Sequence, residues 1–157
     1  MSTTLLVFCF LLGCVTGLRS LTGAAVIAWA AHLGWLKFAG TWLAFVAHPA
    51  ALIVFTLLAI GELIGDKLPK TPARTAPLGL SARIVLGGLC GAALATSGGA
   101  SLAFGSVAGT LGALVGTYGG YNIRHTLVTR MHLPDVAVAL VEDAIAVGGG
   151  FWIVSHL

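Results

Sequence analysis

Residues 84–123 read IVLGGLCGAALATSGGASLAFGSVAGTLGALVGTYGGYNI, and none of these 40 residues is charged. A helix that crosses a bilayer needs about 20 predominantly apolar residues, so the run is long enough for two crossings. Its centre, Ser-Gly-Gly-Ala-Ser at 97–101, has the small and polar composition of a turn. The run therefore predicts a hairpin of two transmembrane helices, at roughly 83–97 and 101–124.

The whole chain shares this apolar character. Of its 157 residues, 58% are hydrophobic and 8% are charged, whereas a soluble domain carries about 25% charged residues. A soluble domain of this size could not bury so much apolar surface, and a disordered chain would need low hydrophobicity. The three cysteines lie in apolar runs and are odd in number, which disfavours a disulfide scaffold. The composition indicates the lipid bilayer as the partner; nucleic acid is not expected, and a homo-oligomer is an open alternative.

Charged residues mark the ends of further apolar runs. They predict four more helices, at roughly 3–18, 20–36, 48–66 and 135–156. The expected fold is all-α: a single integral membrane domain over 1–157, with about six helices in a polytopic bundle. The first, second and fourth helices are short for a full crossing. A small tilt, an interfacial position and a re-entrant path all remain open for them.

The distribution of Lys and Arg predicts the orientation. Six helices place seven of these residues on one side: Arg19, Lys67, Lys70, Arg74, Arg83, Arg124 and Arg130. Lys37 is alone on the other side, so the positive-inside rule predicts a multi-pass protein of the cell inner membrane with both termini outside, in the periplasm of a bacterium. Three of the four tryptophans then fall near the outer interface: Trp35, Trp42 and Trp152.

Glycine is the most distinctive residue of the expected helix at 101–124. Six glycines fall within an arc of about 100° on one face of this helix: Gly105, Gly109, Gly112, Gly116, Gly119 and Gly120. Helix faces that carry only small residues let helices approach closely in lipid, so tight, glycine-rich packing is expected. The pairs Gly13/Gly17, Gly61/Gly65 and Gly87/Gly91 repeat the same spacing. A smooth wall beside a substrate path, or a sliding surface, is the functional alternative.

Two carboxylates lie at the end of the third expected helix. Glu62 and Asp66 are four residues apart and share a face, and Pro69 should stop the helix near Leu68. The helix macrodipole already places negative charge at this end. A basic group or a bound cation must therefore compensate; the candidates on the same side are Lys67, Arg83, Arg19 and Arg124.

Two more carboxylates lie inside the last expected helix, which begins near Pro134-Asp135. Glu142 is about 10 Å deeper than Asp135 on the same face, and Asp143 points about 100° away. Charge at this depth is costly and usually marks a required pair or a functional site. At least one of the two acids must therefore face a polar interior.

Two hypotheses explain these charges. Either the acids and arginines form a salt-bridge lattice that locks the helices, or they form a cytoplasm-facing polar site for an ion, a proton or a lipid headgroup. The candidate site residues are Glu62, Asp66, Glu142, Asp143, Arg19 and Arg124. His125 lies beside Arg124 and could titrate near neutral pH.

No nucleotide-binding, zinc-protease or nucleophile-elbow motif is present, so no cofactor is indicated and the metal is unknown. A small transporter or permease-like protein of unknown substrate is the first functional prediction. One alternative is a lipid-headgroup-modifying enzyme, in which the acids would hold a divalent metal and the arginines a phosphate. The chain lacks a nucleophile-plus-base pattern, so an enzyme is less favoured. The other alternative is a non-catalytic scaffold subunit.

Several of these segments together resemble a known family. They are Gly17-Leu-Arg19, Glu62-Leu-Ile-Gly-Asp66-Lys67-Leu-Pro69, Arg83 with Gly87 and Gly91, the glycine-rich helix that ends at Arg124, and Leu140-Val-Glu142-Asp143. Their order resembles the bacterial membrane family catalogued as domain of unknown function 4126, over nearly the whole chain. The resemblance implies a small, multi-helix inner-membrane protein and no known activity.

Overall fold

The computed structural model describes residues 2–67 and 75–157, and helices are the regular elements of this part of the chain. In order, they are α1 (Thr3–Leu18), α2 (Ser20–His32), the 3-10 helix η1 (Trp42–Ala47), α3 (Pro49–Gly65), α4 (Pro77–Ser97), α5 (Leu102–Thr129) and α6 (Asp135–Ser155). Three of them, α4, α5 and α6, are long and apolar enough to cross a membrane, and α1 and α3 are shorter apolar helices. The predicted all-α membrane bundle is confirmed; the predicted count of six omitted η1.

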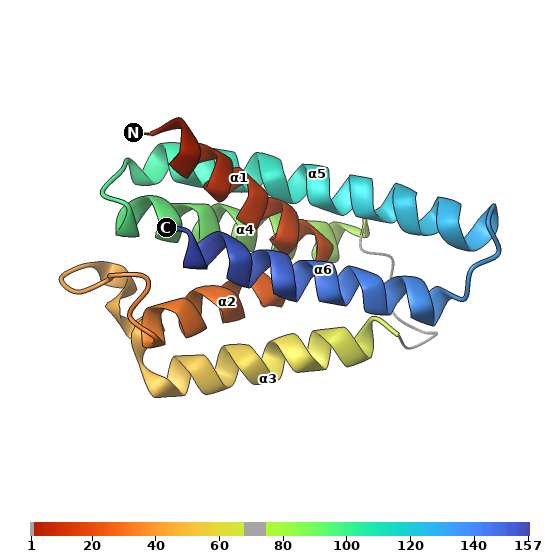
Figure 1. The fold of residues 1–157 in the computed structure, drawn as a ribbon, viewed down its shortest axis with the longest axis horizontal. Helices are drawn as coiled ribbons and strands as arrows, with labels where there is room; N and C mark the ends of the chain where they lie inside the picture. Colours follow the sequence, from red (N-terminus) through yellow and green to blue (C-terminus); the bar gives the residue numbers. More distant parts are fainter. Residues whose placement is uncertain (1, 68–74) are drawn as a thin grey trace.

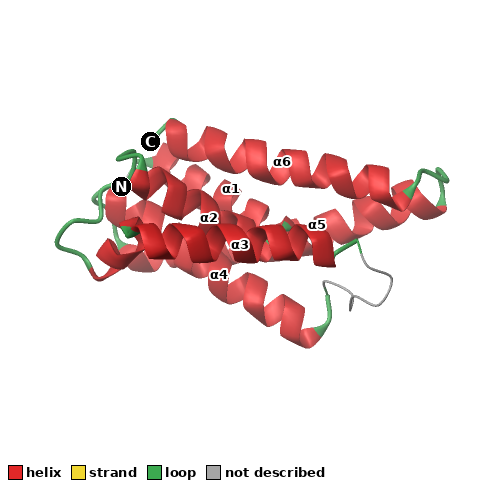
Figure 2. Cartoon of the chain, turned by 90° about the horizontal axis from the view of Figure 1, so that it is seen from below, coloured by secondary structure: helices red, strands yellow, loops and turns green. Residues whose placement is uncertain are grey.

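The α-helices run lengthwise through an elongated bundle (Figure 1). Both termini, the segment 33–48 and the α4–α5 turn lie at one end, which we call the terminal end. The α5–α6 connection at 130–134 lies at the opposite end, the far end, and Figure 2 shows the same arrangement from below. Two termini at one end agree with the expected even number of crossings. Which end faces the cytoplasm stays a prediction.

Several helix boundaries differ from those expected. α4 begins at Pro77 rather than near 83, because proline fits the first turn of a helix, where its missing N–H is not needed. The expected short fourth helix is therefore a helix of 21 residues, which is long enough to cross a membrane. α2 ends at His32 rather than near 36, and Gly34 follows with a positive φ of 78°. The expected helix stop at Leu68-Pro69 lies outside the described residues, as do Lys70 and Arg74.

The backbones of α1, α4 and α5 are in direct contact at glycine residues. A Cβ added at Gly13 or Gly17 of α1 would come within 3.0 Å of the α5 backbone. The same holds for Gly91 of α4 against α5. Real Cβ atoms essentially never approach so closely, so these three helices meet where side chains are missing. The prediction of glycine-mediated packing is confirmed for this helix trio.

Not every glycine in the predicted pattern packs in this way. Gly109, Gly112 and Gly116 of α5 lie against a neighbouring backbone, but Gly119 has open space where a Cβ would stand. The expectation that Gly61 and Gly65 of α3 form a packing face is wrong, because both also face open space. The reason is the position of α3, which packs mainly on α2 at the edge of the bundle. The 100° arc therefore includes both positions in contact with a neighbouring helix and a position, Gly119, that no neighbour covers.

The two short helices α1 and α2 form a hairpin that ends inside the bundle. α1 has 16 residues and α2 has 13, or about 24 and 20 Å of helix, which is less than the roughly 30 Å of a bilayer core. α5, with 28 residues, extends about 42 Å. Figure 1 shows α1 ending well short of the far end of α5. The turn between α1 and α2 consequently lies inside the bundle, short of the far end of α5.

Candidate functional site

Arg19 forms the turn between α1 and α2, which we call the tip. Its backbone is extended, with φ −139° and ψ 105°, and it interrupts the helix after Leu18 and before Ser20. The residue is fully buried, with 0% of its surface exposed. Non-helical backbone at membrane depth is tolerated only where protein or a water-filled cavity surrounds it. The neighbours of the tip therefore have to satisfy both its charge and its broken helix ends.

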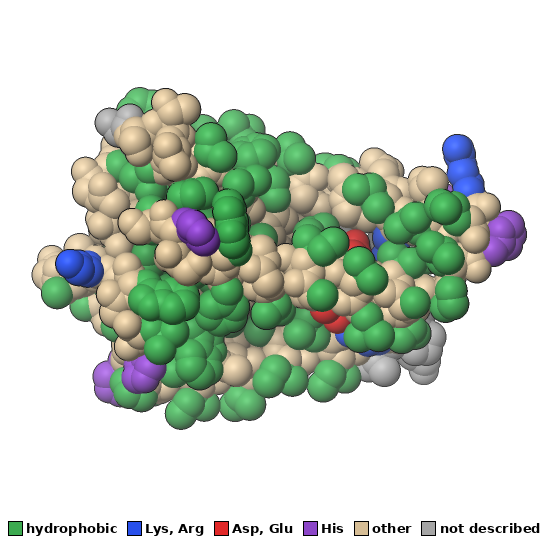
Figure 3. Space-filling model, viewed as in Figure 1, with side chains coloured by type: hydrophobic (Ala, Val, Ile, Leu, Met, Phe, Trp, Pro, Cys, Tyr) green, Lys and Arg blue, Asp and Glu red, His purple; other side chains and the backbone are tan. Residues whose placement is uncertain are grey.

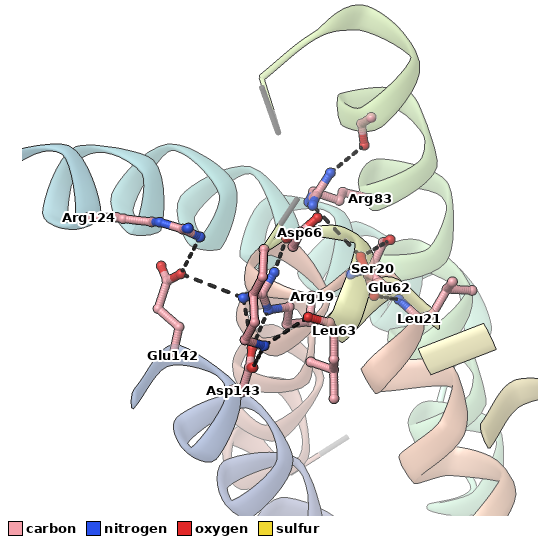
Figure 4. Close-up of polar contacts among 12 residues, drawn as sticks. Arg19, Ser20, Leu21, Glu62, Leu63, Asp66, Arg83, Arg124, Glu142 and Asp143 are labelled. Atoms are coloured by element: carbon pink, nitrogen blue, oxygen red, sulfur yellow. Dashed lines mark hydrogen bonds and ion pairs between the residues drawn. The ribbon is translucent and has the colours of Figure 1, made fainter. Parts of the chain in front are cut away.

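The Arg19 side chain contacts carboxylates from two other helices (Figure 4). Its Nε donates to Asp143 Oδ1 at 2.7 Å, and Nη1 pairs with Asp66. Nη2 lies 2.7 Å from the same Asp143 oxygen, poorly aligned to donate, and 4.0 Å from Glu142 Oε2. One buried cation thus joins the tip to α3 and to α6.

Glu62 closes the N-terminus of α2. Its carboxylate accepts hydrogen bonds from the backbone N–H of Ser20 at 2.7 Å and of Leu21 at 2.8 Å, and from the Ser20 hydroxyl at 2.5 Å. The first N–H groups of a helix have no partner within the helix and carry partial positive charge, so a carboxylate is favoured there. Arg83 Nη2 lies 3.8 Å from the same carboxylate. The expected compensation at Glu62 thus comes from a helix N-terminus as well as from a basic side chain.

Arg83 and Thr117 satisfy the C-terminal end of α1. Both the Nε of Arg83, at 3.2 Å, and the hydroxyl of Thr117, at 3.1 Å, donate to the backbone oxygen of Gly17. Arg83 is only 5% exposed and Thr117 is fully buried. The last carbonyls of a helix lack partners within it and favour a nearby cation. The C-terminal end of α1 and the N-terminal end of α2, which meet at the tip, are therefore both hydrogen-bonded by residues of α3, α4 and α5.

The two adjacent acids of α6 are each 8% exposed and point to different partners. Glu142 and Asp135 share a basic residue on α5, as their common face predicts: Arg124 lies 3.4 Å from Glu142 and 2.7 Å from Asp135. Asp143 lies on another face and pairs with Arg19 and with Lys67, whose Nζ is 2.5 Å from Asp143 Oδ2. Both acids therefore face the interior of the bundle, and each has a basic partner there.

We call the joined ionisable groups the tip cluster. Its members are Arg19, Glu62, Asp66, Lys67, Arg83, Arg124, Asp135, Glu142 and Asp143. All five carboxylates of the sequence belong to it, and each pairs with a basic side chain. The six residues predicted from the sequence are all members, whereas their roles as ligands stay a prediction.

Exposure increases along the cluster toward the far end. The Arg19 side chain is fully buried, those of Glu142 and Asp143 are 11% exposed, and that of Asp135 is 53% exposed. Figure 3 shows small acidic and basic patches on the middle of one face, surrounded by apolar side chains. The cluster thus connects a buried cation to the surface through polar side chains.

Some features of the site could not have been identified from the sequence, and His125 is not a member of the tip cluster. Arg19 was expected in an inner loop, but it lies within the bundle because α1 and α2 are too short to reach the far end. The role of the Ser20 backbone was missed; the only signal was a polar Arg-Ser pair between two apolar runs. His125 is exposed and stacks on Tyr121, with ring centroids 6.1 Å apart.

The chemistry of the cluster is that of ion pairs. Within the residues that the structure describes, no three His, Cys, Asp or Glu side chains gather to hold a metal ion. The divalent-metal site of the enzyme hypothesis therefore lacks a ligand set in this part of the chain. Comparison of the chain with family models, curated proteins and solved structures gave no match. The cluster is consequently interpreted from its geometry alone.

Proposed function

We propose that the protein is a small membrane transporter or permease in which the tip cluster responds to protons or monovalent cations. The observation that carries the proposal is the buried turn at Arg19, which lies inside the bundle and is surrounded by carboxylates. In a membrane-spanning bundle this turn would lie within the bilayer. Broken helices with ionisable partners near the middle of the bilayer are the way many transporters build their binding sites.

The ion pairs around Arg19 offer a simple mechanism for such a response. Arginine stays charged in proteins, so the carboxylates are the groups that can take up a proton or a cation. Asp66 and Asp143 reach Arg19 from α3 and α6. Neutralising either acid weakens the attachment of its helix to the tip and favours an arrangement in which the helices separate. The glycine contacts that join α1, α4 and α5 do not depend on charge, so α3 and α6 are the helices expected to move.

A second candidate function is a non-catalytic membrane scaffold. It is favoured by the pairing of every carboxylate with a basic side chain. In that case the cluster is a lattice that fixes the helices and binds nothing. The two candidates differ in one property, since only a binding site gives the folded protein a stability that depends on its ligand.

Ligand-dependent stability tests this difference. The thermal unfolding of the detergent-solubilised protein is measured across pH and across Li⁺, Na⁺ and K⁺ at constant ionic strength. The transporter proposal predicts a shift in the wild type that Asp143→Asn removes. Arg130→Gln is the control, because Arg130 is an exposed charged residue at the end of α5 and is not a member of the tip cluster. Identical responses of wild type and Asp143→Asn would favour the scaffold.

The placement of the bundle in the membrane is part of the same proposal. We place the far end in the cytoplasm and both termini in the periplasm of a bacterial inner membrane, on the strength of the Lys and Arg distribution. Membership of the family catalogued as domain of unknown function 4126 is proposed from the sequence segments given above. Reporter fusions at Leu157 and near Thr75 test the orientation, and a cytoplasmic Leu157 would contradict it.

A further inference from the structure

A second feature of the molecule is an apolar pocket of about 90 Å³ between α2, η1, α3 and α4. Its lining includes Ile27 of α2, Phe45 of η1, Phe55 of α3, and Leu86 and Leu89 of α4. None of the lining residues is charged, and the carboxylates and arginines of the tip cluster are not among them. The pocket is thus chemically separate from the tip cluster.

The pocket exists because α3 and α4 both pack on α2 but scarcely on each other. Small side chains, Ala24 of α2 and Ala93 of α4, contribute to its lining and are buried. Its other lining residues include Phe45 and Leu89, which are 56% and 44% exposed. The pocket therefore opens on the surface of the bundle beside η1 and α4, toward the terminal end.

The medium beside such an opening decides what can fill it. Residues 77–97 form a helix that is long and apolar enough to cross a membrane, and Leu86 and Leu89 lie near its middle. If this helix crosses, the two residues are at the depth of the hydrocarbon core. Water is not held there, because a cavity without polar partners stays dry. An empty gap would forfeit the dispersion contacts of its walls. A flexible hydrocarbon chain is the available molecule that satisfies both conditions.

The size and the surroundings of the pocket also indicate a chain rather than a protein partner. By the same measure a cavity needs about 10–15 Å³ to hold one water molecule, so a volume of 90 Å³ is enough for a short section of a chain. A docking helix would need a long continuous face. The exposed Trp42 and Phe45 of η1 at the mouth, with Trp35 exposed nearby in sequence, have the composition of an aromatic belt at the lipid headgroups.

We propose that this pocket is a binding site for one acyl chain of a bilayer lipid, which enters from the side between α3 and α4. The lipid belongs to the leaflet in which η1 lies. The bound chain fills the space that α3 and α4 leave open and tethers η1 to the bundle. This site requires a membrane-embedded protein but does not depend on transport by the tip cluster.

The test uses the full chain in nanodiscs of phosphatidylcholine, a fraction of which carries a diazirine on one acyl chain. After illumination, peptide mass spectrometry compares the labelling of Phe45, Phe55 and Leu89 with that of Val107 and Val115. The last two are lipid-facing residues of α5 with 58% and 56% exposure, and they report ordinary contact with the bilayer. The proposal predicts an excess of label at the pocket over the α5 face in the wild type.

Two variants locate that excess. Ala93→Phe and the milder Leu89→Trp fill the pocket and should remove the excess labelling. Leu111→Phe, on the exposed face of α5 and away from the pocket lining, should leave it unchanged. Equal labelling of pocket and α5 face in the wild type would overturn the proposal, even if neither variant folds. So would an undiminished excess in a folded Ala93→Phe protein. A failure of the cation experiment on Asp143→Asn would leave this result unaffected.

Discussion

Replacing Arg19 by Met is expected to cost about 3–5 kcal/mol of unfolding free energy, because it removes one partner of a buried ion pair. The Arg19 side chain is fully buried, and methionine retains most of its apolar volume. Of its three carboxylates, Asp143 keeps Lys67 and Glu142 keeps Arg124. The cost therefore comes chiefly from Asp66, which also lies at the C-terminal end of α3, where the macrodipole opposes a negative charge.

The assay is denaturant and thermal unfolding in detergent micelles, with Arg130→Met as the matched control. Arg130 is the exposed residue that caps α5, and its replacement should change stability by less than about 0.5 kcal/mol. Adding Asp66→Asn to Arg19→Met should recover part of the loss, since the neutral amide no longer needs a cation. The coupling between the two sites should fall in the range of about 0.5–3 kcal/mol. An Arg19→Met protein as stable as Arg130→Met would refute the reasoning.

Three further predictions follow from the contacts. Gly116→Ala should cost about 1–3 kcal/mol by overpacking against the backbone of α1, and Gly119→Ala, which meets open space, should not destabilise the protein; equal thermal unfolding of the two would contradict the packing of α5. Glu62→Gln should cost about 1.5–3 kcal/mol in denaturant unfolding, because it weakens charge-assisted hydrogen bonds to α2, and a neutral result would argue against the capping role. Glu142→Gln should cost about 1–3 kcal/mol by the same measurement. An unchanged stability would mean that Arg124 does not need its second carboxylate.

The helices were predictable because lipid imposes a strong constraint on the sequence. A crossing helix needs a long apolar run, and such runs are visible as the intervals between charges. The bounds of α1, Thr3–Leu18, follow directly from this rule. The charge of Arg83 indicates a boundary, but the helix continues through it, because Arg83 is buried and donates to the backbone oxygens of Gly17 and Gly79. A charge with partners inside the bundle does not have to end a helix.

The membership of the tip cluster was predictable, but its geometry was not. Four carboxylates in a membrane chain must meet basic partners, and Arg19 and Arg124 were the expected ones. The shared face of Asp135 and Glu142 followed from helical periodicity and was confirmed by their common contact with Arg124. The depth of Arg19 depends on how α1 and α2 pack, and the bond from Glu62 to the α2 N-terminus joins segments 42 residues apart. Neither the depth of Arg19 nor this long-range bond can be derived from the local sequence.

Ion flux through the reconstituted protein tests the central claim most directly. Liposomes that contain the wild type, Asp143→Asn or Arg130→Gln are given a pH gradient or a gradient of Na⁺ or K⁺, and its decay is followed with entrapped fluorescent indicators. The transport account predicts that the wild type and Arg130→Gln accelerate the decay of at least one gradient over protein-free liposomes, and that Asp143→Asn does not. Decay at the protein-free rate for all three gradients, with correctly folded wild type in the membrane, would contradict it.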